Sequence, residues 1–332
     1  MDNNLSQSHP YDALTPEIIL GATETFGGRC TGALLALNSY ENRVYRIDRE
    51  EMPPVVGKFY RPGRWSDEQI LEEHSFSLEL AEHEIPVVAP LIHNDHTLHK
   101  YKDFRFSLFP WQPGRAPELR NDSDRELVGR YLGRLHKLGA IKAFQHRPTL
   151  DIESFGHDPV RYLLDNDFLP NYLLEPYQSL TGQLLQQITR AFDNNKNIQN
   201  IRLHGDCHLS NLLWTDTGAH LVDLDDCRMG PAIQDLWMLL SGQREEMEPQ
   251  LDAVLRGYTR FSTFNISELA LIESLRTLRM LHYSAWLARR WQDPAFPRNF
   301  PWFNTQRYWE EQILALREQQ ALLDEPPLNW MG

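Results

Sequence analysis

The stretch LHGDCHLSN, residues 203–211, gathers two histidines, an aspartate, a cysteine and an asparagine between hydrophobic runs, and LVDLDDC follows it closely. A hydrophobic core needs none of these polar side chains. NLLW and AHLVD have the pattern of two short apolar strands, and TDTG between them supplies the Asp and Gly of a tight turn. The segment 211–223 is therefore predicted to be a β-hairpin that folds about residue 217 and places Asn211 opposite Asp223.

This predicted hairpin brings together side chains that suit a magnesium site. The amide oxygen of Asn211 and the carboxylate of Asp223 are hard oxygen ligands, which Mg²⁺ takes while it keeps phosphate oxygens and water as its other ligands. Asp206, in the loop just upstream, can orient an incoming hydroxyl and accept its proton. Together they predict phosphoryl transfer, with Asp206 and Asp223 as catalytic groups and Asn211 and Asp223 as metal ligands.

These residues have two other possible interpretations. Aspartate and asparagine are common in turns, so each of the three residues could be a turn residue or the end of a strand. Their combination around one hairpin disfavours this interpretation. The second alternative is a zinc site built from His204, Asp206, Cys207 and His208. Residues so close in sequence do not easily converge on one tetrahedral ion, and no second cluster supplies the usual spaced pair.

The character of the chain changes near residue 110. Before it, short strand-like runs are broken by one clear helix, SDEQILEEHSFSLELAEH at 66–83, which Ser66 can cap. The predicted strands are 32–38, 42–47, 54–60, 85–92 and 104–110.

Beyond a Pro- and Gly-rich segment at 110–117, which is the natural hinge, the pattern is mostly helical. Apolar residues recur at helical spacing in three long segments, 123–139, 176–192 and 267–291. The sequence therefore predicts an α+β chain in two parts. A small β-rich lobe, residues 1–109, precedes a larger helical lobe, residues 110–332.

Composition limits the partners and the location of the protein. A formal charge of −13, a pI near 5.5 and the absence of a basic run argue against a bulk electrostatic grip on nucleic acid or an anionic membrane. The N-terminus lacks the basic and apolar regions of a signal peptide, and no run of about eighteen apolar residues occurs. Three cysteines without framework spacing fit a reducing compartment. We expect a soluble, cytoplasmic protein and take it to be a monomer.

HGDCHLSN together with VDLDD resembles the catalytic loop and the metal loop of the aminoglycoside and choline kinase-like group, which shares the protein-kinase fold. This group carries a Gly where protein kinases usually have the Arg of H-R-D. Other segments, such as LNSYENRVYRI, VVGKFYRPGRWSDEQ, GPAIQDLWMLL and DPAFPRNFPW, resemble bacterial serine/threonine protein kinases of that group nearly end to end. The resemblance implies a bilobal protein-kinase-like fold that uses ATP and Mg²⁺.

The resemblance also implies roles for a lysine and a glutamate of the β-rich lobe. Lys58, in the strand VVGKFY, would bind the α- and β-phosphates of ATP, although a strand lysine can also simply face solvent. Its partner would be a glutamate on the following helix, where Glu72 and Glu73 are both available. We favour Glu73, because Leu80 then stands seven residues further on, as in the family's helix. The sequence alone does not decide between the two.

LNSYENRVY would cover the nucleotide, and here the chain departs from the G-x-G-x-x-G loop of protein kinases. Phosphate contacts would then come from backbone amides and from Ser39 and Asn42, both of which are also ordinary turn residues. The resemblance makes His204 and Asp235 scaffold residues of the catalytic loop, with Asp235 bonded to loop amides. Asp225 would approach a second metal ion.

Three functions stay open at this point. The chain could phosphorylate Ser or Thr of protein substrates in a stress response, phosphorylate a small alcohol as choline and aminoglycoside kinases do, or bind nucleotide as a non-catalytic regulator. The joint presence of Lys58, Asp206, Asn211 and Asp223 disfavours the regulator. The fold says little about the acceptor, but the near end-to-end resemblance favours proteins as the partners that are phosphorylated.

Overall fold

A computed structural model describes residues 11–216, 218–330 and 332. The chain packs into two compact units. The first runs to Ala116 and includes two later segments, Gln145–Arg147 and Leu212–Asp225; the second comprises Pro117–Phe144, Pro148–Asn211 and Asp226–Gly332. The predicted α+β organisation, with an antiparallel sheet early in the chain and a helical remainder, is confirmed. The lobe boundary expected between residues 109 and 110 stays a prediction.

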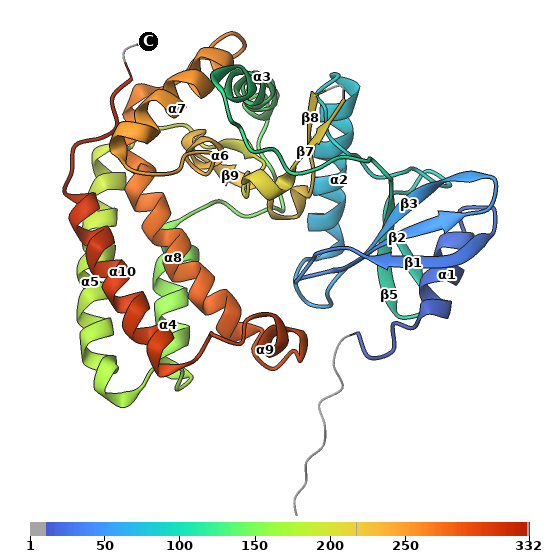
Figure 1. Ribbon diagram of the computed structural model, residues 1–332, viewed down its shortest axis with the longest axis horizontal. Coiled ribbons are helices and arrows are strands. Elements are labelled where there is room, and N and C mark those ends of the chain that lie inside the picture. Colours follow the sequence, from blue (N-terminus) through green and yellow to red (C-terminus); the bar gives the residue numbers. More distant parts are fainter. Residues whose placement is uncertain (1–10, 217, 331) are drawn as a thin grey trace, which may run out of the picture. The chain divides into compact units, whose positions relative to one another are not determined.

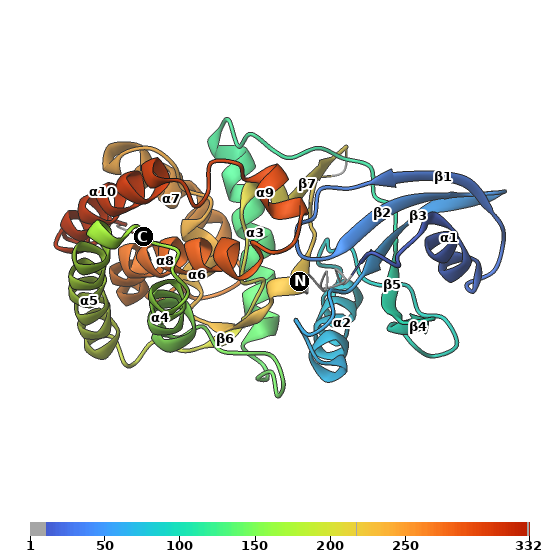
Figure 2. The same ribbon diagram turned by 90° about the horizontal axis from the view of Figure 1, so that it is seen from below.

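An antiparallel five-stranded sheet forms the centre of the first unit, in the order β1-β2-β3-β5-β4 (Figures 1 and 2). Helix α1, Pro16–Glu24, packs against it through Ile19 and Ala22, which join a buried core with Ile47 and Phe59. The strands are β1 Cys30–Ala36, β2 Arg43–Arg49, β3 Met52–Phe59, β4 His99–Tyr101 and β5 Phe104–Pro110.

Four of the five predicted strands of this region are present, and one is not. The segment 85–92 forms only an isolated bridge, from Val87 to Leu221. Pro86 and Pro90 lack the N–H groups that a sheet ladder needs, so this apolar run cannot pair continuously. Helix α1 and strand β4 were not predicted.

Helix α2, Asp67–Glu82, follows the sheet's third strand and begins where the sequence indicates. Ser66 accepts a hydrogen bond from the Gln69 N–H, and the Gln69 side chain accepts one from the Ser66 N–H, which completes a capping box. The helix buries Ile70, Phe76 and Leu80 on one face.

The predicted hairpin is present as β7, Leu212–Thr215, and β8, Gly218–Leu221, but its register differs from the expectation by one residue. Leu212 pairs with Leu221 and Thr215 with Gly218, so continuing the ladder would set Asn211 opposite Val222 rather than Asp223. Leu212 and Leu221 are both buried, and because side chains alternate across a strand, their burial selects this register.

The second unit is helical apart from a short antiparallel pair, β6 Ile201–Leu203 and β9 Arg228–Gly230. Helix α10 lies along α5 and α8, as both views show (Figures 1 and 2). The helices are α3 Asp122–Gly139, α4 Asp158–Asp165, α5 Asn171–Asn194, α6 Ile233–Trp237, α7 Arg244–Tyr258, α8 Ile272–Arg289, α9 Ala295–Asn299 and α10 Gln306–Leu323.

The three predicted long helices correspond to α3, α5 and α8, the last preceded by a 3₁₀ turn at Ile266–Leu271. Among the described residues, no helix combines the length and the apolar character needed to cross a membrane. The cytoplasmic location stays a prediction.

Candidate active site

Lys58 is the most unusual member of β3 because it is a lysine with only 6% of its surface exposed. Successive side chains of a strand point to opposite faces. Val55 and Phe59 enter the core shared with α1, so Lys58 points to the other face, toward α2. The alternative in which Lys58 is a solvent-facing strand residue is therefore wrong.

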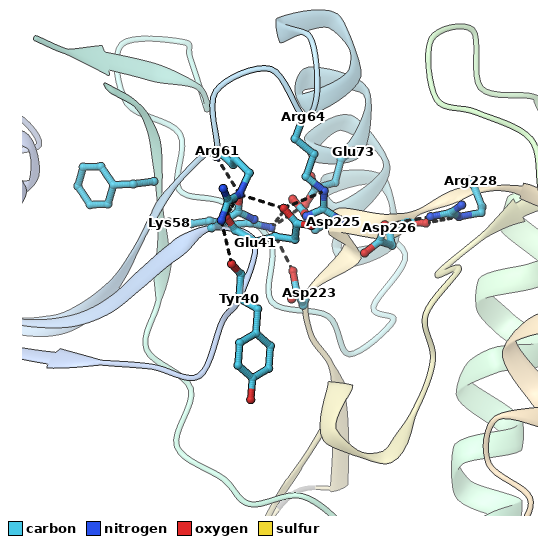
Figure 3. A network of polar contacts seen from close by, with 12 residues as sticks. Tyr40, Glu41, Lys58, Arg61, Arg64, Glu73, Asp223, Asp225, Asp226 and Arg228 are labelled. Carbon is cyan, nitrogen blue, oxygen red and sulfur yellow. Dashed lines mark hydrogen bonds and ion pairs between the residues drawn. The ribbon is translucent and has the colours of Figure 1, made fainter. Parts of the chain in front are cut away.

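Three carboxylates of the first unit surround the Lys58 ammonium (Figure 3). Its Nζ lies 2.8 Å from Asp225 Oδ1, 3.1 Å from Asp223 Oδ1 and 3.8 Å from Glu73 Oε1. Burial disfavours the lysine's charge, but these carboxylates outweigh burial and raise the pKa of Lys58 well above its ordinary value. Burial also raises the pKa of Glu73 to about 7, against the attraction of Lys58.

The two neighbouring glutamates of α2 have different partners. Glu73 is 2% exposed and forms the ion pair predicted with Lys58. Glu72 instead accepts hydrogen bonds from three consecutive backbone N–H groups, those of Gln145 at 2.5 Å, His146 at 2.8 Å and Arg147 at 2.7 Å. Each of the two glutamates therefore holds a specific partner.

Segment Gln145–Arg147 ties α2 to the loop that carries the aspartates. Gln69 of α2 donates to the His146 carbonyl at 3.0 Å, and Arg147 donates to the carbonyl of Asp225. The Arg147 guanidinium also stacks 4.1 Å from the centre of the Trp65 ring. The sequence contained no local signal for this contact, because Arg147 stands in an irregular stretch far from both partners.

The loop between β1 and β2 contains both residues expected to touch phosphate. Ser39 is half-buried there, while Asn42 is only 3% exposed and its Oδ1 accepts the N–H of Arg61 at 3.1 Å. Asn42 thus fastens the loop to the segment that follows β3. Its contact with a nucleotide, and that of Ser39, stays a prediction.

Two arginines connect the β1–β2 loop with the loop that carries Asp225. Arg61 pairs with Glu41 at 3.1 Å and donates to the carbonyl of Tyr40 at 3.2 Å. Arg64 donates to Asp225 Oδ2 and lies 4.0 Å from Glu41 (Figure 3). Asp225 therefore interacts with Lys58 through one oxygen and with Arg64 through the other, and the sequence had not indicated Arg61 or Arg64.

In the second unit, Asp235 binds the backbone of the loop after β6, as expected. Its two carboxylate oxygens accept the N–H groups of His204 and Gly205, both at 2.8 Å. Gly205 has φ +86°, and a Cβ there would overlap the carbonyl oxygen of Asp226. Both facts require glycine at this position. The buried His136 contacts Asp235 at 3.0 Å, a partner that the sequence did not reveal.

The Asp206 side chain, next along this loop, faces two nitrogen-bearing groups. Arg279 Nη1 of α8 lies 2.6 Å from Oδ1, and His208 Nε2 lies 3.4 Å from Oδ2. Burial alone would raise the pKa of Asp206, but the hydrogen bond with His208 and the charge of Arg279 hold it below its ordinary value. Asp206 is therefore an ionised acceptor at neutral pH.

The predicted magnesium ligands offer the right donor atoms. Asn211 uses its Nδ2 to donate to the Asp206 carbonyl at 2.9 Å, so its Oδ1 is the atom available for a metal. The Asp223 side chain is 51% exposed and presents carboxylate oxygens. Over the described residues, no three His, Cys, Asp or Glu side chains gather as a metal cluster.

The predicted residues thus fall into two groups. Lys58, Glu73 and Asp223 lie together in the first unit, joined by Asp225. Asp206 and Asn211 lie together in the second.

A buried lysine paired with a helix glutamate, carboxylates beside it and, in the second unit, a loop with an ionised aspartate are residue types that kinase-type phosphotransferases use. Residues 34–272 match the phosphotransferase enzyme family. The chain is 44% identical to stress response kinase A of Escherichia coli over 96% of both chains. It has the same identity and coverage with the serine/threonine protein kinase RdoA of Salmonella typhimurium. The chain belongs to the phosphotransferase enzyme family, in the group of the stress response kinases A.

Solved structures share the fold at lower identity. An amicoumacin kinase, in complex with AMP-PNP, Ca²⁺ and amicoumacin, superposes with a TM-score of 0.72 at 17% identity over 95% of both chains. A microcompartment-associated aminopropanol kinase gives 0.68 at 18% identity, over 92% of this chain and 95% of its own. The protein is accordingly an ATP-dependent phosphotransferase, and its cofactors are ATP and Mg²⁺.

Proposed function

We propose that the protein transfers the γ-phosphoryl group of ATP to serine or threonine hydroxyls of protein substrates, in the cytoplasm and as part of a stress response. The observation that carries this proposal is the 44% identity, sustained over 96% of the chain, to relatives of which one is named a serine/threonine protein kinase and others stress response kinases. The residues of both units have the chemistry that this reaction needs.

In this proposal, Lys58 binds the α- and β-phosphates, and Glu73 holds its ammonium group in place. The three carboxylates that now surround Lys58 keep it charged, so it stays a cation even though it is buried. Ser39 and Asn42 would contribute to the phosphate loop above it.

Asp223 and Asn211 are the proposed ligands of Mg²⁺. The bound ion neutralises charge on the phosphate oxygens. Asp225 already interacts with Lys58 and Arg64, so its part is to position these cations.

Asp206 is the proposed base. Its side chain is 24% exposed and ionised, and its loop is fixed by Asp235, so it can hold the acceptor hydroxyl and accept its proton as the phosphorus–oxygen bond forms. Asp206→Asn keeps the shape of the side chain but loses the acceptor charge. We expect turnover to fall by roughly 10²- to 10⁴-fold while ATP binding survives.

The deciding experiment is a comparison of acceptors. The purified full-length chain would be incubated with labelled ATP and Mg²⁺, once with a protein and peptide panel and once with choline, an aminoglycoside and simple sugars. We expect alkali-labile, acid-stable phosphate on protein, including on the chain itself, and little product from the small alcohols. Asp206→Asn should abolish the phosphoprotein.

A small alcohol phosphorylated orders of magnitude better than any protein, with no phosphoprotein formed, would overturn the protein acceptor. The phosphotransferase assignment would remain, and Lys58, Asp206, Asn211 and Asp223 would keep their proposed roles.

A further inference from the structure

Arg279 occupies the hydrogen-bonding position that an acceptor hydroxyl would need. Its Nη1 lies 2.6 Å from Asp206 Oδ1, while the second oxygen, Oδ2, faces His208 at 3.4 Å. An incoming hydroxyl has to donate to one of these two oxygens before its proton can be transferred. Because each carboxylate oxygen can accept more than one hydrogen bond, the acceptor binds beside these two nitrogen donors or replaces one of them.

The Arg279 side chain is free enough to give up this position. It extends from α8 with 40% of its surface exposed, and among the described residues Asp206 is the one carboxylate with which it forms an ion pair. Asp235, below the loop, is fully buried and committed to backbone N–H groups, so it cannot replace Asp206 as a partner. A carboxylate brought by the acceptor could.

Two other acidic side chains of the second unit, Asp226 and Glu273, already have cationic partners. The Asp226 carboxylate is neutralised by Arg228 at 2.9 Å (Figure 3), and Glu273, the acidic residue of α8, pairs with Arg276 at 3.5 Å. Arg279 is balanced by Asp206, its ion-pair partner among the described residues. A cationic amino alcohol carries no carboxylate that could take the place of Asp206 as this partner.

We infer that Arg279 is the acceptor-specificity residue, and that it selects serine or threonine hydroxyls flanked by acidic residues. It releases Asp206 Oδ1 to the hydroxyl and pairs with a carboxylate of the substrate instead. One charge-assisted pair is exchanged for another, so the release costs little. A substrate with a neutral or basic flank has no carboxylate that could replace Asp206 as the partner of Arg279. This inference rests on the proposed protein kinase function and specifies its substrate class.

The neighbouring surface of α8 suits a polypeptide flank. Tyr283 and Trp286 stand four and seven residues after Arg279, on the same side of the helix. Their rings stack with centres 5.5 Å apart, and Tyr283 is 40% exposed. Aromatic side chains beside a cation present contact area for a peptide on one side of its reactive residue.

The test uses two peptides that share one acceptor serine and differ only in their flanks, with glutamate in one and lysine in the other. We expect wild type to prefer the acidic peptide by about tenfold or more in kcat/KM, the effect of one charged pair. Arg279→Gln should lose this preference through a higher KM for the acidic peptide, with the KM for ATP unchanged. Arg279→Lys should restore part of it.

Arg307→Gln is the matched control, because Arg307 makes a similar 2.7 Å pair with Glu311 on the exposed face of α10. It should keep the wild-type preference. Melting temperatures of all variants show whether each one is folded. An acidic preference that survives in folded Arg279→Gln, or a wild-type preference for the basic peptide, would overturn the inference.

A failure of the proposed function would give a different result in this test from a failure of the inference about Arg279. If no peptide is phosphorylated but small alcohols are, the same comparison is made with glycerate and choline as anionic and cationic acceptors. A preference for glycerate that Arg279→Gln removes would uphold the role of Arg279 while the protein acceptor fails. A preference for choline in wild type would overturn the role of Arg279 as well.

Discussion

The ammonium nitrogen of Lys58 lies 2.8 Å from Asp225 Oδ1, in a pair whose side chains are 7% and 3% exposed. This contact is shorter than the 3.8 Å between Lys58 and Glu73, the pair that the sequence indicated. The lysine is thus bound more closely to the aspartate loop than to helix α2. Removing one member of such a buried pair leaves the other charge uncompensated, which typically costs about 3–5 kcal/mol.

Lys58→Met should therefore harm both activity and stability. The phosphates lose a positioning charge, and Asp223, Asp225 and Glu73 lose their shared cation. We expect turnover to fall strongly and the free energy of unfolding to drop by about 2–5 kcal/mol. Phosphotransfer assays and denaturant unfolding would measure the two effects. A variant as stable as wild type would contradict the importance of the buried charge cluster.

The stability loss of Lys58→Met should depend on pH in a defined direction. The pKa of Glu73 is raised by burial from 4.5 to about 7, while Lys58 lowers it. A carboxyl group with a raised pKa favours folding in its protonated form, and this contribution is lost as pH rises through the folded-state value. Without Lys58 the pKa rises further. The deficit relative to wild type should be smaller at about pH 5.5 than at about pH 8.5, as thermal unfolding would show.

Glu73→Gln and Glu72→Gln should separate function from stability. Glu73→Gln removes a buried charge that burial disfavours, so it should lower turnover while the melting temperature at about pH 8 stays at least at the wild-type value. Glu72→Gln weakens charge-assisted bonds to three backbone N–H groups, so it should lower stability by about 1–3 kcal/mol. Turnover per folded molecule should suffer less. The reverse pattern would show that the two roles are exchanged.

Asp223→Asn should abolish Mg²⁺-supported turnover without unfolding the protein. Asp223 has φ +59°, a conformation that asparagine tolerates nearly as well as aspartate, and its side chain is half exposed. Asp216→Asn, at the exposed turn of the same hairpin, is the control and should remain active. The check is activity across a Mg²⁺ titration together with the melting temperature. Near-normal turnover of Asp223→Asn at saturating Mg²⁺ would refute the proposed ligand.

Gly205→Ala should disrupt the loop of Asp206. The left-handed backbone alone costs about 1–2 kcal/mol for alanine, and the added Cβ would overlap the Asp226 carbonyl. Gly182→Ala, in α5, is the control, since a Cβ there meets nothing within 4 Å and should stabilise by about 0.4–1 kcal/mol. Unfolding experiments and phosphotransfer assays on both variants decide this. Wild-type stability in Gly205→Ala would show that the loop can rearrange.

Local sequence patterns predicted the features that depend on interactions between residues close together in the chain. Ser66 and Gln69 stand three residues apart, which is the spacing of a capping box, and α2 begins there. The apolar runs that became β3 and β5 are buried along much of their length, as interior strands are. The resemblance to a known family supplied the roles of Lys58 and Glu73, which periodicity could not give.

The hairpin register shows where local information ends. TDTG is compatible with more than one type of turn. The sequence predicted Asn211 opposite Asp223, whereas the pairing in the structure is shifted by one residue. Burial of Leu212 and Leu221 on one face favours the observed pairing, since a one-residue slip would place the two on opposite faces of the hairpin. Burial depends on which residues pack against the hairpin, and the local sequence of the hairpin does not contain that information.

The sequence by itself determined the kinds of residues that carry phosphate chemistry, the order of a β-rich part and a helical part, and the helix that carries Glu73. Only the tertiary structure decided which charges meet: Glu72 with the backbone of 145–147, Arg147 with the Asp225 carbonyl, and Arg279 with Asp206 across 73 residues. Such pairs leave no period or spacing in the sequence. Long polar side chains form such pairs wherever folding buries a carbonyl oxygen or a carboxylate that lacks a hydrogen-bond donor. A buried acceptor left without a donor costs more free energy than ordering the side chain that reaches it.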